Sequence, residues 1–450
     1  MTPLKTECNA ETYAFGKLDR RQVVADFSGG PITTDGGLIL IAQIDQQYQI
    51  SERLAACFED QRDPARVQHS LTNLVAQRLY GLVQGYEDLN DHDQLRQDPM
   101  FGIAIGKLDS EHERCAPLAG KSTLNRLEQS MHVAGDLSEQ RYIKYSVAPE
   151  EVEQLLVSVC IEQMEPQPKQ IILDLDVTDD PTHGGQEQAF FNGYYGHTCY
   201  APLLIFCGRH LLAAKLPPSS VDPAAGALEE LQRIVPQISS HWPDVTIIVR
   251  GDSVYGRDDI MSWCEAQANV EYVFAYASNA RLRGFTWGLE QRAKAAYDQQ
   301  RQAVESKLNP FFSGETEPLQ ADIDPLVPPQ LWYQSLDYRT LDSWSCSRRM
   351  GCKLTYDATG AYRHFVVTAF ATQQLPPGKL HAQYYCPRGE MENRIKEHQL
   401  DLFSDRTSTH EFESNQLRLW FVLVCLCADA SLAPSIKCQL IVWLSSKYYD

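Results

Sequence analysis

Apolar positions follow a helical spacing in the first third of the chain and form strand-like runs in the middle third. From Leu38 to about Ser130 the apolar residues recur at intervals typical of helices, most clearly at 71–83. The pattern changes at 169–177, where apolar residues surround two aspartates in a nearly continuous run, typical of a strand covered on both faces. Similar runs predict strands at 200–207, 210–215 and 245–249, and an amphipathic helix at 224–238. This alternation of strands and helix indicates an α/β sheet.

These patterns divide the chain into four regions. Residues 1–150 form a helical N-terminal region, and residues 151–277 form the first part of an α/β core. Between 278 and 383 the pattern weakens into polar and Pro-rich stretches with some strand-like runs, which indicates a β-rich insertion. Residues 384–450 complete the core with helices. The runs that define the last two regions are 352–356, 364–369, 390–400 and 415–432.

Composition and charge restrict the class of protein. The chain has 450 residues, of which 43% are hydrophobic, so we expect a globular protein with one large core or several smaller ones. No apolar stretch is long enough to span a bilayer and the N-terminus carries no apolar signal segment, so we expect a cytoplasmic protein without a membrane partner. The net charge of -19 argues against a protein that coats DNA non-specifically. Any contact with DNA must then come from local basic patches.

Two aspartates stand at or near the ends of predicted strands. Asp176 lies near the end of the run at 169–177, and Asp252 follows the run at 245–249. Open α/β sheets bind ligands at the carboxyl ends of their strands. Most acids in proteins are simply exposed at turns, and this remains the alternative for either residue taken alone. Clustered carboxylates are also the oxygen ligands that Mg2+ requires.

Several motifs resemble those of one enzyme family. The run Asp174-Leu-Asp176-Val-Thr178, the later Phe191-Asn-Gly-Tyr-Tyr, and Arg250-Gly-Asp252 are similar to motifs of bacterial insertion-sequence transposases, the DDE domain group 1 family. The resemblance extends to 27–37, 121–128 and 385–397, and so covers nearly the whole chain, from about Val24 to Leu432.

The resemblance implies an RNase H-like catalytic core and a DNA strand-cleaving and strand-joining activity. It implies that Asp176, Asp252 and Glu392 are the catalytic acids and hold two Mg2+ ions, for which Mn2+ can substitute. Water and then a freed 3′-hydroxyl would attack phosphodiesters in line. In similar transposases the last Glu belongs to a Tyr-x2-Arg-x3-Glu-x6-Lys arrangement. Tyr385 and Arg388 fill its first two places here, and Gln399 stands at the position of the Lys.

The partners implied are the terminal inverted repeats of the element, target DNA and a second copy of the chain. Tyr385 and Arg388 are expected DNA contacts, and Lys396 could partly replace the missing Lys because it lies on the same helical face as Gln399. Arg281 and Arg283 belong to a locally basic window at 281–294, where a solvated helix face is the alternative to phosphate contacts.

Two candidate DNA-binding features remain open. The segment 121–126 carries a cation at each end and is a possible recognition helix within the N-terminal region. Any of Trp287, Trp332 and Trp344 could stack on an unpaired base, although packing is the ordinary role of an aromatic residue.

Other interpretations of the same residues are possible. Asp174-x-Asp176-x-Thr178 also matches haloacid-dehalogenase-like phosphatases, in which the first Asp is the nucleophile. A catalytically decayed transposase that only binds DNA is a third alternative. His183 and His197 could be metal ligands, but neither has a second His or Cys at ligand spacing, so we expect structural roles. Because residues two apart on a strand face the same way, Asp174 competes with Asp176, and we favour Asp176 for its place nearer the strand end.

Overall fold

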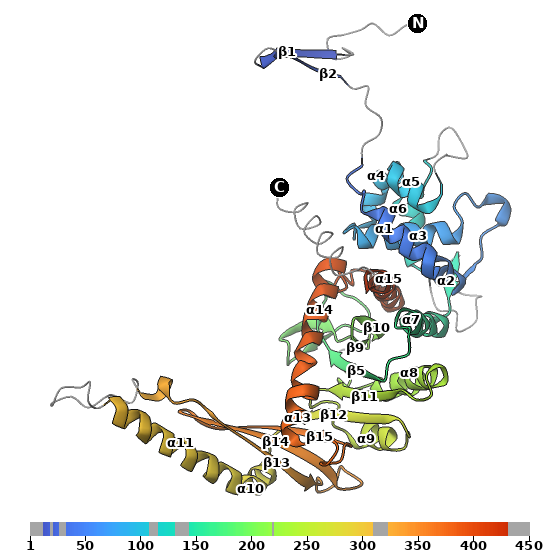
Figure 1. Ribbon diagram of the computed structural model, residues 1–450. Coiled ribbons are helices and arrows are strands. Elements are labelled where there is room, and N and C mark those ends of the chain that lie inside the picture. The colour runs from blue at the N-terminus through green and yellow to red at the C-terminus, as the bar shows by residue number, and fades with distance from the viewer. Residues whose placement is uncertain are drawn as a thin grey trace, which may run out of the picture.

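The structure of the protein is a computed structural model (Figure 1). It describes backbone and side chains for residues 33–107, 116–130, 144–217, 220–308 and 323–425, and the backbone alone for 12–18, 21–26 and 426–430. The motif at 27–37 and the helix expected at 415–432 therefore lie partly outside the described residues. Within the described part of the chain, no helix is long and apolar enough to cross a membrane.

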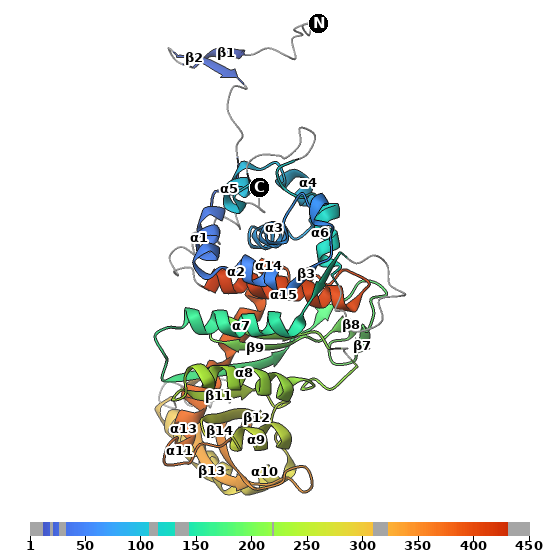
Figure 2. The same ribbon diagram turned by 90° about the vertical axis from the view of Figure 1, so that its right-hand side faces the viewer.

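Helices form most of the N-terminal region, as the apolar spacing predicts. They are α1 (Leu38–Tyr48), α2 (Ile50–Ala56), α3 (Leu71–Val83), α4 (His92–Leu95), α5 (Pro99–Ile105) and α6 (Lys121–Glu128). Ser70 begins α3 by accepting a hydrogen bond from the Asn73 amide, and Figure 2 shows α3 end-on among the other helices. The periodicity did not predict two strand pairs, β1 (Thr12–Leu18) with β2 (Arg21–Asp26) and β3 (Phe58–Asp60) with β4 (Tyr145–Val147).

A mixed eight-stranded sheet forms the core. Its strands are β5 (Gln170–Val177), β9 (Leu203–Cys207), β10 (His210–Lys215), β11 (Thr246–Gly251), β12 (Val270–Tyr276), β13 (Gln330–Tyr338), β14 (Arg348–Asp357) and β15 (Gly360–Thr368). They lie in the order β10-β9-β5-β11-β12-β15-β14-β13. β11 and β12 run parallel to β5, whereas β9 runs antiparallel between β5 and β10. The first five strands of this order form the expected RNase H-like core.

Packed layers cover both faces of the sheet. On one face, α8 (Ala227–His241) and α9 (Asp258–Glu265) bury side chains such as Leu231 against Leu173 of β5. On the other face, Ile172 of β5 packs in a separate apolar cluster with Leu380. Successive residues of β5 thus enter opposite layers, which explains the nearly continuous apolar run in the sequence. α7 (Pro149–Gln163) lies between the sheet and the N-terminal helices (Figure 2).

The segment predicted as one strand at 200–207 is divided between two sheets. β8 (His197–Tyr200) belongs to a small sheet with β6 (Asp180–Pro181) and β7 (Phe190–Asn192), in the order β6-β8-β7, whereas β9 belongs to the core. Pro202 lies in the gap between β8 and β9, where its lack of an amide hydrogen prevents continuous strand pairing. The small sheet is therefore a separate layer beside the carboxyl end of β5.

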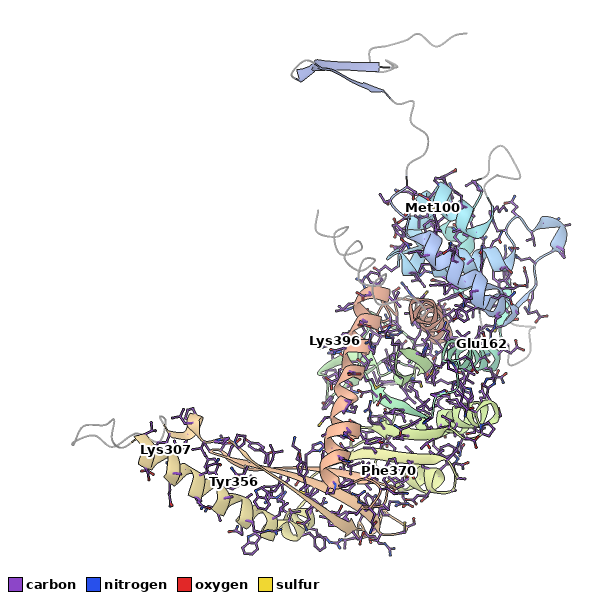
Figure 3. The ribbon with its side chains drawn as sticks, viewed as in Figure 1. Met100, Glu162, Lys307, Tyr356, Phe370 and Lys396 are labelled. Carbon is purple, nitrogen blue, oxygen red and sulfur yellow. The ribbon has the colours of Figure 1, made fainter. Side chains whose placement is uncertain are left out.

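The insertion is β-rich, as expected, but one of its three strands, β13, and two helices were not predicted from the pattern. α10 (Ala280–Phe285) and α11 (Trp287–Leu308) occupy its first part. Only three of the 22 residues of α11 are buried, so its sequence lacks the apolar period of a core helix. One of them, Tyr297, packs against Tyr356 of β14, with ring centroids 5.6 Å apart, and Figure 3 shows Tyr356 on the side of β14 near α11. Pairing of β15 with β12 makes the three strands an extension of the core sheet.

The C-terminal region returns to the core. It consists of α13 (Pro377–Lys379), η7 (Leu380–Tyr385), η8 (Cys386–Arg388), α14 (Gly389–Leu402) and α15 (Phe412–Ala430). Figure 1 shows the segment from α13 to α14 crossing the strands from β12 towards β10. α15 packs on α3, α7 and β10, and so joins the N-terminal helices to the sheet.

Candidate active site

The two aspartates of the sequence motifs lie at the same edge of the sheet. β5 and β11 are adjacent and parallel, and their register pairs Asp174 with Arg250 and Leu175 with Gly251. Asp176 and Asp252, the next residues along the two segments, therefore lie side by side at the carboxyl ends of β5 and β11. Extended strands pair at about 5 Å, so this register brings the two carboxylates into mutual electrostatic range.

Asp176 is a partly buried carboxylate in a charged environment. Its side chain is 16% exposed, its Oδ1 accepts a hydrogen bond from the Val177 amide at 3.0 Å, and its Oδ2 lies 2.9 Å from Arg388 Nη1. Burial, together with the charge of Asp252, raises the pKa of Asp176 to about 6 against the opposing effect of Arg388. An ionised Asp176 is therefore costly unless a cation accompanies it.

Asp252 begins a tight turn after β11. Its Oδ1 accepts the Val254 amide at 2.9 Å, which fixes the turn. Gly251 is required here because a Cβ at this position would lie 2.6 Å from the ring of Tyr255. The Tyr255 hydroxyl is buried and has no hydrogen-bond partner among the described residues. Burial and the nearby charges of Asp176 and Asp252 raise the pKa of Tyr255, so its hydroxyl stays neutral.

Arg388 connects the strand edge to α14. Its guanidinium contacts Asp176 through Nη1 and Glu392 through Nη2, the latter at 3.3 Å, one helical turn further along. Burial lowers the pKa of Arg388, but Asp176, Tyr385 and Glu392 together raise it above its usual value. Glu392 is 57% exposed at the start of α14. One fixed cation thus bridges the first and third of the expected acids.

The arrangement can bring all three acids to one cation only after a rearrangement. Among the described residues, no three His, Cys, Asp or Glu side chains are grouped closely enough to hold a metal ion. In the described part of the chain, Arg388 links Glu392 to Asp176, whereas Asp252 lies near enough for its charge to raise the pKa of Asp176. Mg2+ needs only one or two protein carboxylates beside substrate phosphate and water, so the pair of aspartates has suitable chemistry.

Asp174 has a different environment from Asp176. It is 6% exposed, and its two oxygens accept hydrogen bonds from Arg250 Nε at 2.5 Å and Nη2 at 2.7 Å. Arg250 also donates to the Tyr384 carbonyl. Burial raises the pKa of Asp174, and Arg250 counteracts it. A carboxylate bound at both oxygens is poorly placed to attack phosphorus, so this geometry does not support the phosphatase alternative.

Gln399 holds the end of β5 against α14. Its Nε2 donates to Thr178 Oγ1 and to the Asp179 carbonyl, each at 3.2 Å. Arg388, Glu392, Lys396 and Gln399 follow the i, i+4, i+8 and i+11 stripe of one helical face. Lys396 is exposed on this face, and Figure 3 shows it on α14. The residue at the usual Lys position therefore forms hydrogen bonds that tie α14 to the segment after Asp176.

The other candidates lie apart from the acids. Arg281 and Arg283 are exposed on α10, where Arg281 donates to the Arg339 carbonyl and lies over the Tyr338 ring. The three tryptophans differ in exposure: Trp344 is buried, Trp332 is partly buried and Trp287 is 63% exposed.

His197 and His183, the two histidines considered as metal ligands, also have other surroundings. His197 Nε2 lies 2.9 Å from Asp179, in agreement with a structural role, and His183 lines a surface cavity with His410.

Sequence reasoning assigned no role to two tyrosines near the acids. Tyr255 lies three positions after Asp252, and Tyr195 donates a 3.5 Å hydrogen bond to the Val177 carbonyl. Tyr195 is the last residue of the motif that begins at Phe191, but the apolar pattern of this segment does not indicate that the small sheet packs beside the end of β5. The only available signal was its place in that motif.

Comparison with known proteins gives three findings. The family model described as transposase DDE domain group 1 matches residues 15–428. No curated protein matches the chain. Among solved structures, a piggyBac transposase synaptic complex with hairpin DNA is similar at 9% identity and a TM-score of 0.38, covering 91% of this chain and 79% of that one.

Proposed function

The chain belongs to the transposase DDE domain group 1 family, and from this premise we propose that Asp176, Asp252 and Glu392 are its catalytic acids. A member of this family is a DNA transposase, which cleaves DNA strands and transfers them. The observation that supports the assignment of the acids is that β5, β11 and α14 bring them together. Asp176 and Asp252 end adjacent parallel strands, and Arg388 links Asp176 to Glu392 on α14.

Enzymes of this family depend on divalent metal ions, and we propose two Mg2+ ions here, with Mn2+ as a substitute. Asp176 and Asp252 would hold the ions, and Glu392 would join them once Arg388 releases it. The fit is supported by the high pKa of Asp176 and by the buried Tyr255 hydroxyl near both acids. When bound, the ions would stabilise negative charge on the attacking and leaving oxygens of the phosphodiester.

Arg388 has two tasks in this proposal. Before DNA arrives, it offsets part of the negative charge of Asp176 and Glu392, which would otherwise repel the phosphate backbone more strongly. When a phosphate enters, the guanidinium can turn to it, because two phosphate oxygens suit its forked geometry. Tyr385, which hydrogen-bonds with Arg388, would guide this rotation of the guanidinium. Lys396, Arg281 and Arg283 are further proposed phosphate contacts.

Recognition of the element ends is proposed for the N-terminal helices. One face of α6 exposes Lys121, Ser122, Asn125 and Arg126, side chains that can contact phosphates and base edges. The substrates would be duplex DNA with the terminal inverted repeats, and target DNA. The active form would contain at least two chains, because two ends must be held together for joining.

Cleavage of the DNA that flanks the protein's own gene tests the proposal. Labelled duplexes carrying the imperfect inverted repeats expected there would be incubated with Mg2+ and each variant. Asp252→Ala should lower the cleavage rate by about 1000-fold or more, because the acids act as one unit. Asp244→Ala, an exposed acid just before the other end of β11, should stay within about 2-fold of wild type. Equal rates for Asp252→Ala and wild type would refute the assignment.

A further inference from the structure

Exposed aromatic side chains gather on the hairpin formed by β7 and β8, residues 190–200, which we call the aromatic hairpin. Phe190 is 46% exposed, Phe191 68% and Tyr194 90%. Residues 188–196 carry no charged side chain. Large hydrophobic side chains gathered on one exposed surface element usually mark a binding surface.

The turn of the aromatic hairpin is held in one conformation. Asn192 Oδ1 accepts the Tyr194 amide at 2.9 Å and the Tyr195 amide at 3.4 Å. The Gly196 amide donates to the Asn192 carbonyl at 2.8 Å, and Gly196 has a φ of +80°, a region that favours glycine. At the base of the turn, His197 pairs with Asp179. The backbone therefore presents Tyr194 to solvent in a fixed place, which lowers the entropy lost on binding.

The aromatic hairpin adjoins the acids. The Tyr194 ring packs edge-to-face on Tyr195, with centroids 5.0 Å apart, and the Tyr195 hydroxyl donates to the Val177 carbonyl, next to Asp176. Burial, together with the charges of Asp179 and Asp176, raises the pKa of Tyr195 to about 12, in keeping with this proximity. A DNA strand whose phosphate reaches Asp176 must pass close to this surface.

We infer that the aromatic hairpin binds unpaired nucleobases beside the cleaved phosphodiester, with Tyr194 and Phe191 as stacking surfaces. The inference rests on the proposed function. The uncharged surface favours bases over phosphates, since phosphate contacts require cations or other donors. The bases must be unpaired, because within a duplex their faces are already stacked on neighbours. Stacking on an aromatic ring tolerates any base, so the site would add affinity without sequence preference.

Fluorescence of 2-aminopurine placed at single positions flanking the cut tests this inference. With the full-length protein, quenching is expected at one or two positions of an end that has an unpaired flank. Tyr194→Ala should abolish the quenching and weaken binding of that DNA by about 10-fold, within the range known for one stacked base. Tyr194→Phe should behave like wild type, because the ring and not the hydroxyl stacks. Binding of a fully paired duplex should be unchanged in both variants.

Controls separate this inference from the proposed function. Leu341→Ala removes a side chain that is 77% exposed, in the loop whose Ser345 bonds to Asp258 of α9, and it should leave the quenching intact. If wild type cleaves the labelled ends in Mg2+ but Tyr194→Ala and Phe191→Ala match it in quenching and affinity, only the inference fails. If wild type does not cleave, the proposed function fails and the inference with it. A changed oligomeric state with unchanged quenching would show a protein-binding surface and overturn the inference.

Discussion

Two aspartates that lie two residues apart on β5 should have opposite effects on stability when each is changed to asparagine. Asp174 and Arg250 are 6% and 5% exposed and share two hydrogen bonds. Burial raises the pKa of Asp174 as well, but both of its oxygens are bonded to a buried guanidinium that cannot lose its charge. Asp174→Asn leaves that guanidinium without its counter-charge, which should cost about 3–5 kcal/mol of unfolding free energy. For a domain the size of this core, that corresponds to a melting temperature lower by roughly 10 °C.

Asp176→Asn should instead raise the stability of the metal-free protein. The pKa of Asp176 is about 6, against 3.8 without the protein environment, because burial disfavours its charge. Above pH 6 the ionised side chain therefore costs roughly 3 kcal/mol, which the neutral amide avoids. This figure already includes the opposing charge of Arg388, which lowers the pKa of Asp176. We expect a melting temperature a few degrees above wild type at pH 7.5.

Thermal melts of both variants, with and without Mg2+, measure this contrast. Mg2+ should raise the melting temperature of wild type but hardly that of Asp176→Asn, because the amide binds the ion weakly. Below its melting temperature, Asp174→Asn should retain measurable strand cleavage, whereas Asp176→Asn should have none. The reasoning fails if Asp174→Asn melts with wild type, or if Asp176→Asn is destabilised as much as Asp174→Asn.

Three further outcomes are expected. Gln399→Leu removes two hydrogen bonds between α14 and the end of β5, so single-turnover cleavage should slow by about 10-fold with unchanged DNA affinity, whereas Leu400→Ala should not slow it. Burial lowers the pKa of His398 to about 3, so between pH 6.5 and 4 only the unfolded state binds a proton at this residue, and the free energy of unfolding falls by about 1.4 kcal/mol per pH unit. In urea unfolding, His398→Leu should remove this part of the pH dependence. Arg388→Gln should bind Mn2+ about 10-fold more tightly without DNA, as measured by electron paramagnetic resonance, since the guanidinium no longer competes for Asp176; unchanged Mn2+ affinity would contradict that competition.

The sequence predicted the local features of the site but not its contacts. The apolar run around Asp176 identifies a strand covered on both faces, and the motifs indicate Asp252 and Glu392 as candidates. The bridge made by Arg388 and the contact of Gln399 with the end of β5 join segments more than 200 positions apart. Such contacts depend on strand order and on how α14 crosses the sheet, which periodicity does not encode. α11 was missed for a related reason, because few of its residues are buried.

The separate environments of Asp174 and Asp176 also lay beyond the sequence. Alternation along a strand places both side chains on one face. Only the register of β11, which sets Arg250 opposite Asp174, distinguishes a paired acid from one at the strand edge. The preference for Asp176 in the sequence rested on its position near the end of the run, and it stays a prediction that the two asparagine variants test.

The most direct test of the three-acid assignment is strand transfer from element ends that have already been cut. Such ends carry the free 3′-hydroxyl, so the first cleavage is not needed and joining to target DNA is measured alone. Because one set of acids serves both steps, Asp176→Asn, Asp252→Ala and Glu392→Ala should each abolish joining in Mg2+, while Asp244→Ala joins like wild type. Joining at the wild-type rate by any of the first three variants would contradict the assignment.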